Sequence, residues 1–429
     1  MKVFIIAYAC EPNKQSEPGL GWNISGEIAR RHDVTVLTRA NNRTVIEDYV
    51  RHHPDGPHAK IRFLYHDKGG LSRCLKKRVP LGGQLYFSTW LKSAAKRFKS
   101  QFCQYDIVHQ LTFSPFFVKP WGAAYTDRYV WGPIGGGGGI DARFPKGFAV
   151  DGFQFKFIEW LYKVISLAVY SPFAWQFKAL RGKCAAITFK AKSFSVGFPI
   201  APGQISAITQ ETGYDGEIPP RQYNPNQHSL KIIAVGRMIP HKGFEYAIKG
   251  FQKFLADGGK GEFHIFGDGP LRAKLESIAS LSTNDSRLTT NDYQLTTKPT
   301  TNDSPIIFHG NVPNAEVHAM LDVADVFLHG SFIEAAAWSI LEAMIHGVPI
   351  VCQNRSGMAD MVADDCGTKV NAVTPDELIN GFASALSAYY TDPSLVRRHG
   401  ETGQRRVREQ YTWTRCGDLI NEVYAKINQ

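Results

Sequence analysis

The sequence predicts an α/β protein made of two domains, each with a parallel β-sheet covered by helices on both faces. The chain has 429 residues, which is enough for two domains with cores of ordinary size. Short apolar runs alternate with amphipathic segments, and this alternation is typical of parallel sheets wrapped by helices. The alternation restarts after a polar, proline-containing stretch at 224–229, which predicts a linker there.

The first domain is expected over residues 1–225. It opens with a strand, followed by a polar loop that contains Gly19 and Gly21 and by a helix at 22–31. Gly19 and Gly21 alone are too weak a signal for a dinucleotide-binding fingerprint, because the full G-x-G-x-x-G run is absent. The strands of this domain are predicted at 3–9, 34–38, 61–65 and 107–110.

The second domain is expected over residues 226–410, and a last helix at 416–427 follows it. A stretch at 282–304 is rich in Ser, Thr and Asn and has few apolar residues to bury, so it is expected to be a disordered surface insertion. Helices are predicted at 271–279 and 336–346. Strands are predicted at 231–235, 264–266, 306–309, 323–329 and 350–352.

The charge of the chain is unevenly distributed. Residues 1–225 carry a balance of +14 and residues 226–429 a balance of −4, so the first domain is expected to face something anionic. Between residues 68 and 103 nine basic side chains and no acidic one alternate with aromatic and aliphatic residues. This pattern favours an amphipathic helix on an anionic membrane surface, with a solvated basic helix as the alternative. No recognised nucleic-acid-binding motif is present, so nucleic acid is not expected as a partner.

A second aromatic segment, 153–183, is a further candidate for membrane contact. Its uncharged run covers only 164–177, which is shorter than the 20 or so residues that a membrane span needs. The seven cysteines are dispersed and form no C-x-x-C pair, which argues for reduced thiols and against a zinc site or a disulfide framework. These observations predict a cytoplasmic protein without a metal site, peripheral on the inner face of a membrane.

The most informative motif runs from residue 331 to 351. A strand leads into a loop carrying Ser331 and Glu334, a helix carrying Glu342 follows, and Gly347 ends that helix before the next strand. The loop end of such a unit is where ligands bind, so the two carboxylates could contact different parts of one extended ligand. The alternative is an ordinary helix with one exposed and one paired glutamate.

Two further loops follow predicted strands. Gly236, Arg237 and Lys242 lie between a strand and a helix start, an arrangement suited to binding a diphosphate. The Gly-Asp-Gly-Pro sequence at 267–270 follows the strand at 264–266, although a plain turn explains it almost as well. His109 ends the strand at 107–110, where a histidine is either structural or a ligand contact.

Together these motifs resemble the retaining glycosyltransferases of family 4, which have the GT-B fold of two Rossmann-like domains facing across a cleft. The resemblance implies that Glu334 contacts the transferred sugar, together with the backbone amides of Ala335 and Ala336. It implies that Glu342 accepts hydrogen bonds from the ribose hydroxyls. Arg237 and Lys242 would hold the diphosphate and stabilise the charge that develops on it as it leaves.

The resemblance extends to further positions. It implies that His109 contacts the transferred sugar and helps to position the acceptor, and that the segment 411–429 packs back on the first domain. The expected catalytic residues are thus His109, Glu334, Arg237 and Lys242. The expected donor-binding residues are Gly19, Gly21, Gly236, Arg237, Lys242, Gly267, Gly269, Glu334, Ala335, Ala336 and Glu342.

The sequence also departs from the family pattern. Ala335 stands where the family usually has glycine, and Ser356 and Asp360 replace a glycine and a glutamate.

From the resemblance we expect a retaining hexosyltransferase that moves a sugar from a nucleotide diphosphate sugar to a glycan or lipid-linked acceptor, in cell-surface polysaccharide or glycolipid synthesis. No cofactor or obligatory metal is expected. The alternatives are another GT-B enzyme, such as a sugar-nucleotide epimerase, and a non-catalytic sugar-nucleotide-binding scaffold.

Overall fold

The computed structural model describes residues 1–68, 82–136, 160, 164, 175–224, 228–280 and 304–429. These residues form two compact units. The first unit contains the described residues of 1–137, 157–215 and 411–429, and the second those of 216–410. The chain therefore enters the second unit near residue 216, whereas the composition of the sequence predicts a boundary at 225.

The first unit is built on a parallel sheet in the order β3-β2-β1-β4-β5-β6-β7. Its central strands are buried along their whole length, which is expected when helices cover both faces. The strand order reverses between β1 and β4. The loops that follow these two strands therefore run in opposite directions and create a topological switch point at their carboxyl ends. The strands are β1 (Lys2–Ile6), β2 (Asp33–Thr38), β3 (Arg62–Tyr65), β4 (Ile107–Gln110), β5 (Tyr129–Ile134), β6 (Cys184–Phe189) and β7 (Ile205–Ile208).

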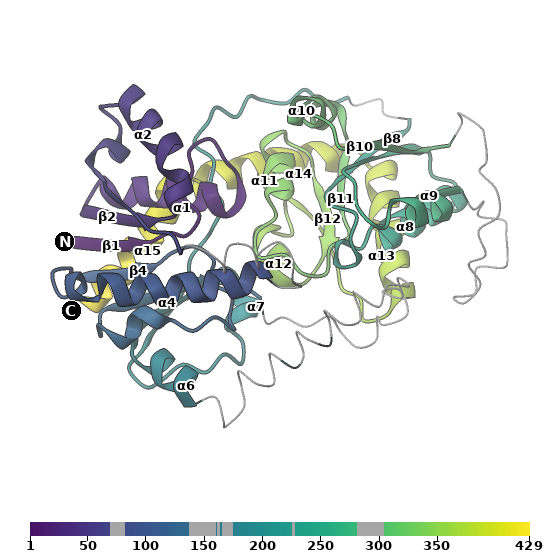
Figure 1. Ribbon diagram of the computed structural model, residues 1–429. Helices are drawn as coiled ribbons and strands as arrows, with labels where there is room; N and C mark the ends of the chain where they lie inside the picture. The colour runs from purple at the N-terminus through teal and green to yellow at the C-terminus, as the bar shows by residue number, and fades with distance from the viewer. Residues whose placement is uncertain (69–81, 137–159, 161–163, 165–174, 225–227, 281–303) are drawn as a thin grey trace. The chain divides into compact units, whose positions relative to one another are not determined.

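Side chains alternate between the two faces of this sheet. Phe4 on β1 contacts Phe98 and Phe102 of α4, whereas His109 on β4 contacts Tyr424 of α15 on the opposite face. Helices α1 and α15 pack against one another on that second face (Figure 1). The helices are α1 (Ser16–Ala29), α2 (Arg43–His52), α4 (Gly82–Phe102), α6 (Trp175–Gly182), α7 (Lys192–Ser195) and α15 (Trp413–Ile427), with 3₁₀ turns η1 (Ala40–Asn42), η2 (Pro57–Lys60) and η3 (Trp121–Ala124).

The second unit has a parallel sheet in the order β10-β9-β8-β11-β12-β13. The order reverses between β8 and β11, which places a second switch point at their carboxyl ends. Helices α8 and α13 pack together on one side of this sheet, and α11 and α14 pack together on the other (Figure 1). The strands are β8 (Leu230–Val235), β9 (Gly261–Phe266), β10 (Ile306–Gly310), β11 (Val326–His329), β12 (Ile350–Gln353) and β13 (Gly367–Val370).

The helices of the second unit carry the chain between these strands. Helix α13 begins with Pro375 after the N-cap Thr374, whose side chain accepts a hydrogen bond from the Glu377 amide. The helices are α8 (Phe244–Ala256), α9 (Arg272–Ser280), α10 (Asn314–Val323), α11 (Trp338–Ile345), α12 (Ser356–Met361), α13 (Pro375–Thr391) and α14 (Pro393–Gln410), with the 3₁₀ turn η4 (Pro240–Lys242).

Helix α1 begins at Ser16, six residues earlier than the sequence predicts. Gly19 and Gly21 therefore lie inside the helix and not in a loop. Both are buried, and a Cβ atom on either would overlap a backbone carbonyl oxygen, that of Lys14 at Gly19 and that of Ala9 at Gly21. Glycine is common in loops, so the sequence predicts a loop here. In the structure the two glycines instead allow the helix to pack closely on the chain that precedes it.

Within the basic segment 68–103, the structure shows where the apolar side chains of 86–102 lie. In α4 the side chains at helical spacing, including Trp90, Leu91 and Phe98, are buried in the core of the first unit, while Lys92, Lys96 and Lys99 are exposed. Contact of the segment 68–103 with an anionic membrane surface therefore stays a prediction that rests on the exposed lysines. None of the helices in the described part of the chain is long and apolar enough to cross a membrane. Much of 153–183 and nearly all of 282–304 lie outside the described residues.

Candidate functional site

The predicted donor-site motifs meet at the switch point of the second sheet. The loop with Arg237 and Lys242 follows β8, and the loop with Glu334 follows β11, the strand that is hydrogen-bonded to β8. Because parallel strands end at the same edge of a sheet, residues about 90 positions apart in sequence are brought together there.

Two glycines allow these loops to touch. Gly243 adopts φ +63°, and a Cβ atom there would overlap the carbonyl oxygen of Gly330. The loops are then joined by hydrogen bonds to the carbonyl oxygen of His241, from the Phe332 amide at 2.8 Å and from the Ser331 hydroxyl at 3.1 Å. This close backbone contact sets the distance between the side chains that the loops carry.

Lys242 and Glu334 form an ion pair across the two loops. The side chains are only 22% and 15% exposed, so solvent screens the pair weakly. The same Glu334 oxygen lies 3.4 Å from the Ser331 hydroxyl and 3.9 Å from Nε2 of His329. Glu334 is thus held by its neighbours and still reaches the surface of the loop.

The surroundings of this carboxylate decide the charges at neutral pH. Burial acts to raise the pKa of Glu334, but the positive charge of Lys242 lowers it below its usual value. Burial lowers the pKa of His329 to about 4 and also lowers that of His241. Glu334 is therefore ionised and both histidines are neutral.

The backbone of Glu334 is held from a third loop, after β12. The Ser356 hydroxyl donates to the Glu334 carbonyl oxygen at 2.6 Å and accepts from the Glu334 amide at 3.2 Å. The Gly357 amide donates to the same carbonyl at 2.7 Å, and a Cβ atom on Gly357 would overlap the Ala335 carbonyl oxygen. Ser356 adopts φ +55°, a left-handed conformation that is unusual for serine.

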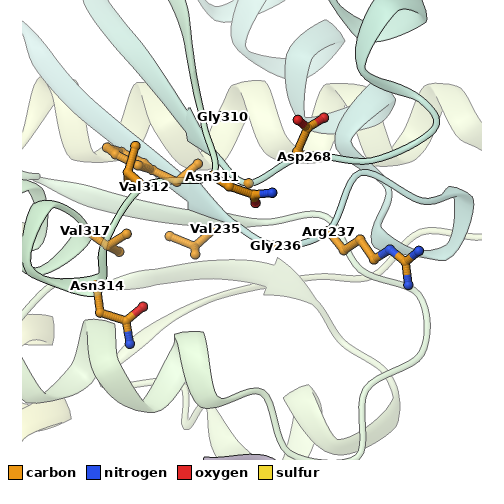
Figure 2. Close-up of a pocket in the computed structure, with 11 residues that line it drawn as sticks. Val235, Gly236, Arg237, Asp268, Gly310, Asn311, Val312, Asn314 and Val317 are labelled. Atoms are coloured by element: carbon orange, nitrogen blue, oxygen red, sulfur yellow. The ribbon is translucent and has the colours of Figure 1, made fainter.

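A pocket of about 400 Å³ opens beside these loops, at the carboxyl ends of β8, β9 and β10. Figure 2 shows Val235 and Val317 on its apolar side, with the side chains of Asn311, Asn314 and Asp268 around it. An apolar surface with a few polar groups is typical of small-molecule sites. Its lining residues are Val235, Gly236, Arg237, Phe266, Gly267, Asp268, Gly310, Asn311, Val312, Asn314 and Val317.

Glycines again determine the shape of this pocket. A Cβ atom on Gly267 would overlap the Gly236 carbonyl oxygen, and one on Gly269 would lie 2.5 Å from the Met238 carbonyl oxygen. The loops after β8 and β9 are therefore in backbone contact, and the Met238 amide donates to the Asp268 carbonyl at 2.9 Å. The predicted residues Gly236 and Gly267 thus lie together in the pocket wall, and Gly269 packs on the loop after β8 beside it.

Arg237 is exposed at the edge of the pocket, and its guanidinium points away from Val235 and Val317 (Figure 2). Within the described ranges no carboxylate lies in ion-pairing distance of it, in contrast to Lys242. Ala335 and Ala336 are partly exposed just before α11, and Glu342 is partly buried within α11. The structure thus places the motif residues on one edge of one sheet, and their contacts with a donor remain predictions.

His109 is a structural residue in this protein. It is fully buried in β4; its Nε2 donates to the Gly132 carbonyl at 2.8 Å and its Nδ1 accepts from the Tyr424 hydroxyl at 2.6 Å. Burial lowers its pKa to about 4, so the ring is neutral. Both nitrogens are occupied and no ring atom reaches the surface, which corrects the expectation that His109 contacts a sugar.

Several residues of the site were missed by sequence reasoning. Ser331 and His241 lie beside predicted residues, and this proximity was the available signal. His329 ends β11 and could have been noted as a polar residue in an apolar strand. Ser356 carries no sequence signal for its role, because its double hydrogen bond depends on a left-handed backbone.

The fold agrees with comparisons to known proteins. The whole chain is similar to sucrose-phosphate synthase from Thermosynechococcus elongatus, with a TM-score of 0.60, 15% identity and coverage of 100% of this chain and 99% of that one. This likeness shows the fold: two parallel-sheet α/β domains of the GT-B type.

Residues 229–392, within the second unit, match the family of glycosyl transferases group 1. The chain is 31% identical over 209 residues to 2-deoxystreptamine glucosyltransferase of Streptomyces kanamyceticus, covering 47% of each protein. It is 28% identical over 176 residues to a putative colanic acid biosynthesis glycosyltransferase of Escherichia coli (strain K12), covering 40% of this chain and 38% of that one. The chain thus spans less than half the length of these relatives, and the matches support a group 1 glycosyltransferase domain in the second unit.

Proposed function

We propose that this protein is a retaining hexosyltransferase that moves a sugar from a nucleotide diphosphate sugar to a glycan or lipid-linked acceptor. The observation that carries the proposal is the joint position of the Lys242–Glu334 pair and the adjoining pocket at one switch point. Its Lys and Arg cations, a carboxylate and a pocket of about 400 Å³ lie where α/β sheets bind nucleotides.

Each part of the site has a part of the donor to bind. The pocket takes the nucleoside, with Glu342 accepting from the ribose hydroxyls. Arg237 and Lys242 hold the diphosphate, and Glu334, with the amides of Ala335 and Ala336, holds the sugar. The match to group 1 glycosyltransferases over 229–392 supports this division, because every one of these residues lies within the matched range.

The chemistry follows from where charge develops. When the bond between the sugar and the phosphate breaks, negative charge gathers on the leaving diphosphate, and Arg237 and Lys242 stabilise it. Lys242 is paired with Glu334 before the donor binds. On binding, the diphosphate either joins Glu334 as a second partner of the Lys242 ammonium or displaces it. The acceptor hydroxyl attacks from the face that the diphosphate leaves, and a phosphate oxygen takes its proton, which retains the anomeric configuration.

The two cations can supply the positive charge that a divalent ion provides in other phosphoryl-leaving reactions. We therefore propose that transfer needs no obligatory metal. Dialysis against EDTA should leave the rate within about twofold of the untreated protein, since an essential metal typically supplies several kcal/mol of transition-state stabilisation. A loss of activity that Mg²⁺ or Mn²⁺ restores would contradict this part of the proposal.

We further propose a role in cell-surface polysaccharide or glycolipid synthesis, at the inner face of a cytoplasmic membrane. The similarity to a colanic acid biosynthesis glycosyltransferase supports the first part. The exposed Lys92, Lys96 and Lys99 of α4 support electrostatic contact with anionic lipids, without insertion of apolar side chains. Binding to anionic vesicles that is abolished by moderate salt is the expected behaviour.

The deciding test compares Arg237→Ala with Lys253→Ala in a donor-hydrolysis and transfer assay. Both changes remove one exposed cation of the second unit, but Lys253 is paired with Asp257 at the far end of α8. Removal of a group that stabilises transition-state charge is expected to reduce turnover about 100-fold or more in Arg237→Ala. Lys253→Ala should stay close to wild type. Near-normal transfer by folded Arg237→Ala would refute the assignment, and donor binding without any turnover would favour a scaffold.

A further inference from the structure

The last residue of β11 is a buried histidine with one unsatisfied ring nitrogen. Only 5% of the His329 side chain is exposed, and its ring lies nearly parallel to that of Phe327, with the centroids 5.9 Å apart. Within the described residues, Nε2 of His329 has no hydrogen-bond partner. Buried polar atoms nearly always have a partner, because a hydrogen bond that is not made costs free energy, so this nitrogen requires an explanation.

An acceptor lies just out of reach of this nitrogen. Oε1 of Glu334 is 3.9 Å from Nε2 of His329, about 1 Å beyond an ordinary hydrogen bond. The same oxygen is paired with the Lys242 ammonium on the other loop. The carboxylate is therefore held by Lys242, and departure of that ammonium leaves it free to turn toward the ring.

Other polar groups beside this oxygen have already used their protons. The Ser331 hydroxyl lies 3.4 Å from Oε1, but its single proton goes to the closer carbonyl oxygen of His241, at 3.1 Å. Gln353 donates its two amide protons to carbonyl oxygens of the same loop, at 2.7 and 3.0 Å. Of these neighbours in the described part of the chain, only His329 can donate a further hydrogen bond.

Binding of a diphosphate changes the partners of the Glu334 carboxylate. The negative charge of the diphosphate attracts the Lys242 ammonium, and Glu334, only 15% exposed, is left as a largely buried charge. Such an unpaired charge opposes binding. Burial keeps the His329 ring neutral, and a neutral imidazole still carries one N–H. This ring can therefore satisfy the carboxylate without adding a charge beside the diphosphate.

We propose that His329 is a positioning residue that replaces Lys242 as the partner of Glu334 when the donor binds. Nε2 of His329 then donates to Oε1, which moves toward the ring by about 1 Å. Glu334 stays fixed for its contact with the sugar while Lys242 turns to the diphosphate. The proposal rests on the proposed function, because it requires a donor whose diphosphate reaches Lys242.

Calorimetric titration of the full chain with UDP, GDP and ADP at pH 8 tests this exchange without a sugar. His329→Leu removes both ring nitrogens and should weaken binding of the preferred diphosphate about tenfold or more, since a hydrogen bond to a charged group is lost. His329→Gln should restore most of the affinity, because its amide reaches the position of Nε2. The shorter His329→Asn does not reach it and should bind as weakly as His329→Leu.

His399→Leu is the matched control. His399 lies in α14, outside the matched range 229–392, and its Nδ1 is bonded to the Tyr389 hydroxyl at 2.8 Å. Its replacement should lower the unfolding temperature and leave the Kd of the diphosphate unchanged. The pattern expected of His329→Leu is a raised Kd in a folded protein, which the loss of a purely structural histidine does not produce.

A double-mutant cycle with Glu334→Gln assigns the effect to this pair of side chains. In the Glu334→Gln background no carboxylate charge is left to satisfy, so His329→Leu should change the Kd less than about twofold. Thermal unfolding establishes which variants are folded, and the comparison of His329→Gln with His329→Asn decides the question if His329→Leu does not fold.

Two results overturn the proposal alone: equal binding by the wild-type protein and folded His329→Leu, or an equal loss in both backgrounds of the cycle. Equal binding by His329→Gln and His329→Asn has the same consequence. If the folded wild-type protein binds none of the three diphosphates, the proposed function fails together with this inference. The two kinds of failure are therefore distinguishable in one set of titrations.

Discussion

At the residue scale, the position of Glu334 depends on one hydroxyl group. Ser356 bonds both the amide and the carbonyl of Glu334, and it does so from a left-handed conformation. A glycine at this position would relieve the backbone strain but would lose both hydrogen bonds. We interpret Ser356 as a residue whose strained backbone is offset by the two hydrogen bonds that fix the Glu334 loop.

Ser356→Ala and Ser356→Gly separate these two effects. The alanine variant keeps the strain and loses the hydrogen bonds, so its free energy of unfolding should fall by about 1–2 kcal/mol. The glycine variant should be close to wild-type stability, because relief of the positive φ offsets about 1 kcal/mol of that loss. Both should lower kcat more than they raise KM for the donor. Denaturant unfolding and steady-state kinetics provide the measurements, and equal stability of the two variants would contradict the account.

Gly357 provides a sharper test of the same loop. A Cβ atom there would overlap the Ala335 carbonyl, so Gly357→Ala should displace the loop and reduce donor turnover at least tenfold, an effect typical of small misplacements in active sites. Gly182 has open space around its Cα, and Gly182→Ala is the matched control that should leave turnover unchanged. Turnover by Gly357→Ala that equals the control would show that the loop contact is unimportant.

The residue scale also shows how far sequence reasoning reaches. Glu334 and Lys242 could be predicted because each sits in a loop after an apolar strand, and parallel strands bring such loops together. The ion pair between Glu334 and Lys242 could not be predicted, because it depends on the backbone contact between Gly243 and Gly330. His109 was misread because a histidine at a strand end is compatible with either a ligand contact or a buried network.

At the scale of elements, the hydrophobic periodicity of the sequence predicted where helices lie, but it did not predict what their apolar faces pack against. The apolar and basic residues of α4 predicted an amphipathic helix, and the apolar face proved to be the one that the sheet covers. In α1 the glycines suggested a loop, whereas buried close packing explains them. Local composition thus specified the presence of the elements, and tertiary contacts decided which face was buried and where the helix began.

Helix α15 contributes a buried hydroxyl to the first sheet, and this link can be tested. Tyr424→Phe leaves Nδ1 of His109 without a partner in a fully buried place, so the free energy of unfolding should fall by about 1–3 kcal/mol. Tyr125 is 41% exposed, and Tyr125→Phe should change stability by less than about 0.5 kcal/mol. Urea unfolding measures both, and equal effects of the two substitutions would contradict the role assigned to the Tyr424 hydroxyl.

At the scale of the whole molecule, each unit contains a fully buried neutral histidine, His109 in the first and His329 in the second. Their pKa values are about 4, below the ordinary 6.5, because burial disfavours the charged ring. The unfolded chain therefore binds more protons than the folded one between pH 6.5 and pH 4. The stability that these residues contribute is complete above pH 6.5 and falls as the pH is lowered through this window.

Both units should accordingly lose stability between pH 7 and pH 5, by on the order of 1–2 kcal/mol for each buried histidine. Scanning calorimetry over this range measures the effect. Stability that stays constant from pH 7 to pH 5 would show that the buried rings do not remain neutral.

The account as a whole depends on donor binding by the second unit. The most direct measurement is a calorimetric titration of the full chain with a panel of UDP-, GDP- and ADP-sugars, with Glu342→Ala and Glu409→Ala in parallel. Glu409 is an exposed glutamate near the end of α14, outside the matched motif, and serves as the control. We predict one preferred nucleotide sugar, bound at least tenfold more weakly by Glu342→Ala and unchanged in Glu409→Ala, since a lost charge-assisted hydrogen bond removes about 1.5–3 kcal/mol. Absence of binding to every donor by the folded protein, or equal binding by both variants, would contradict the central claim.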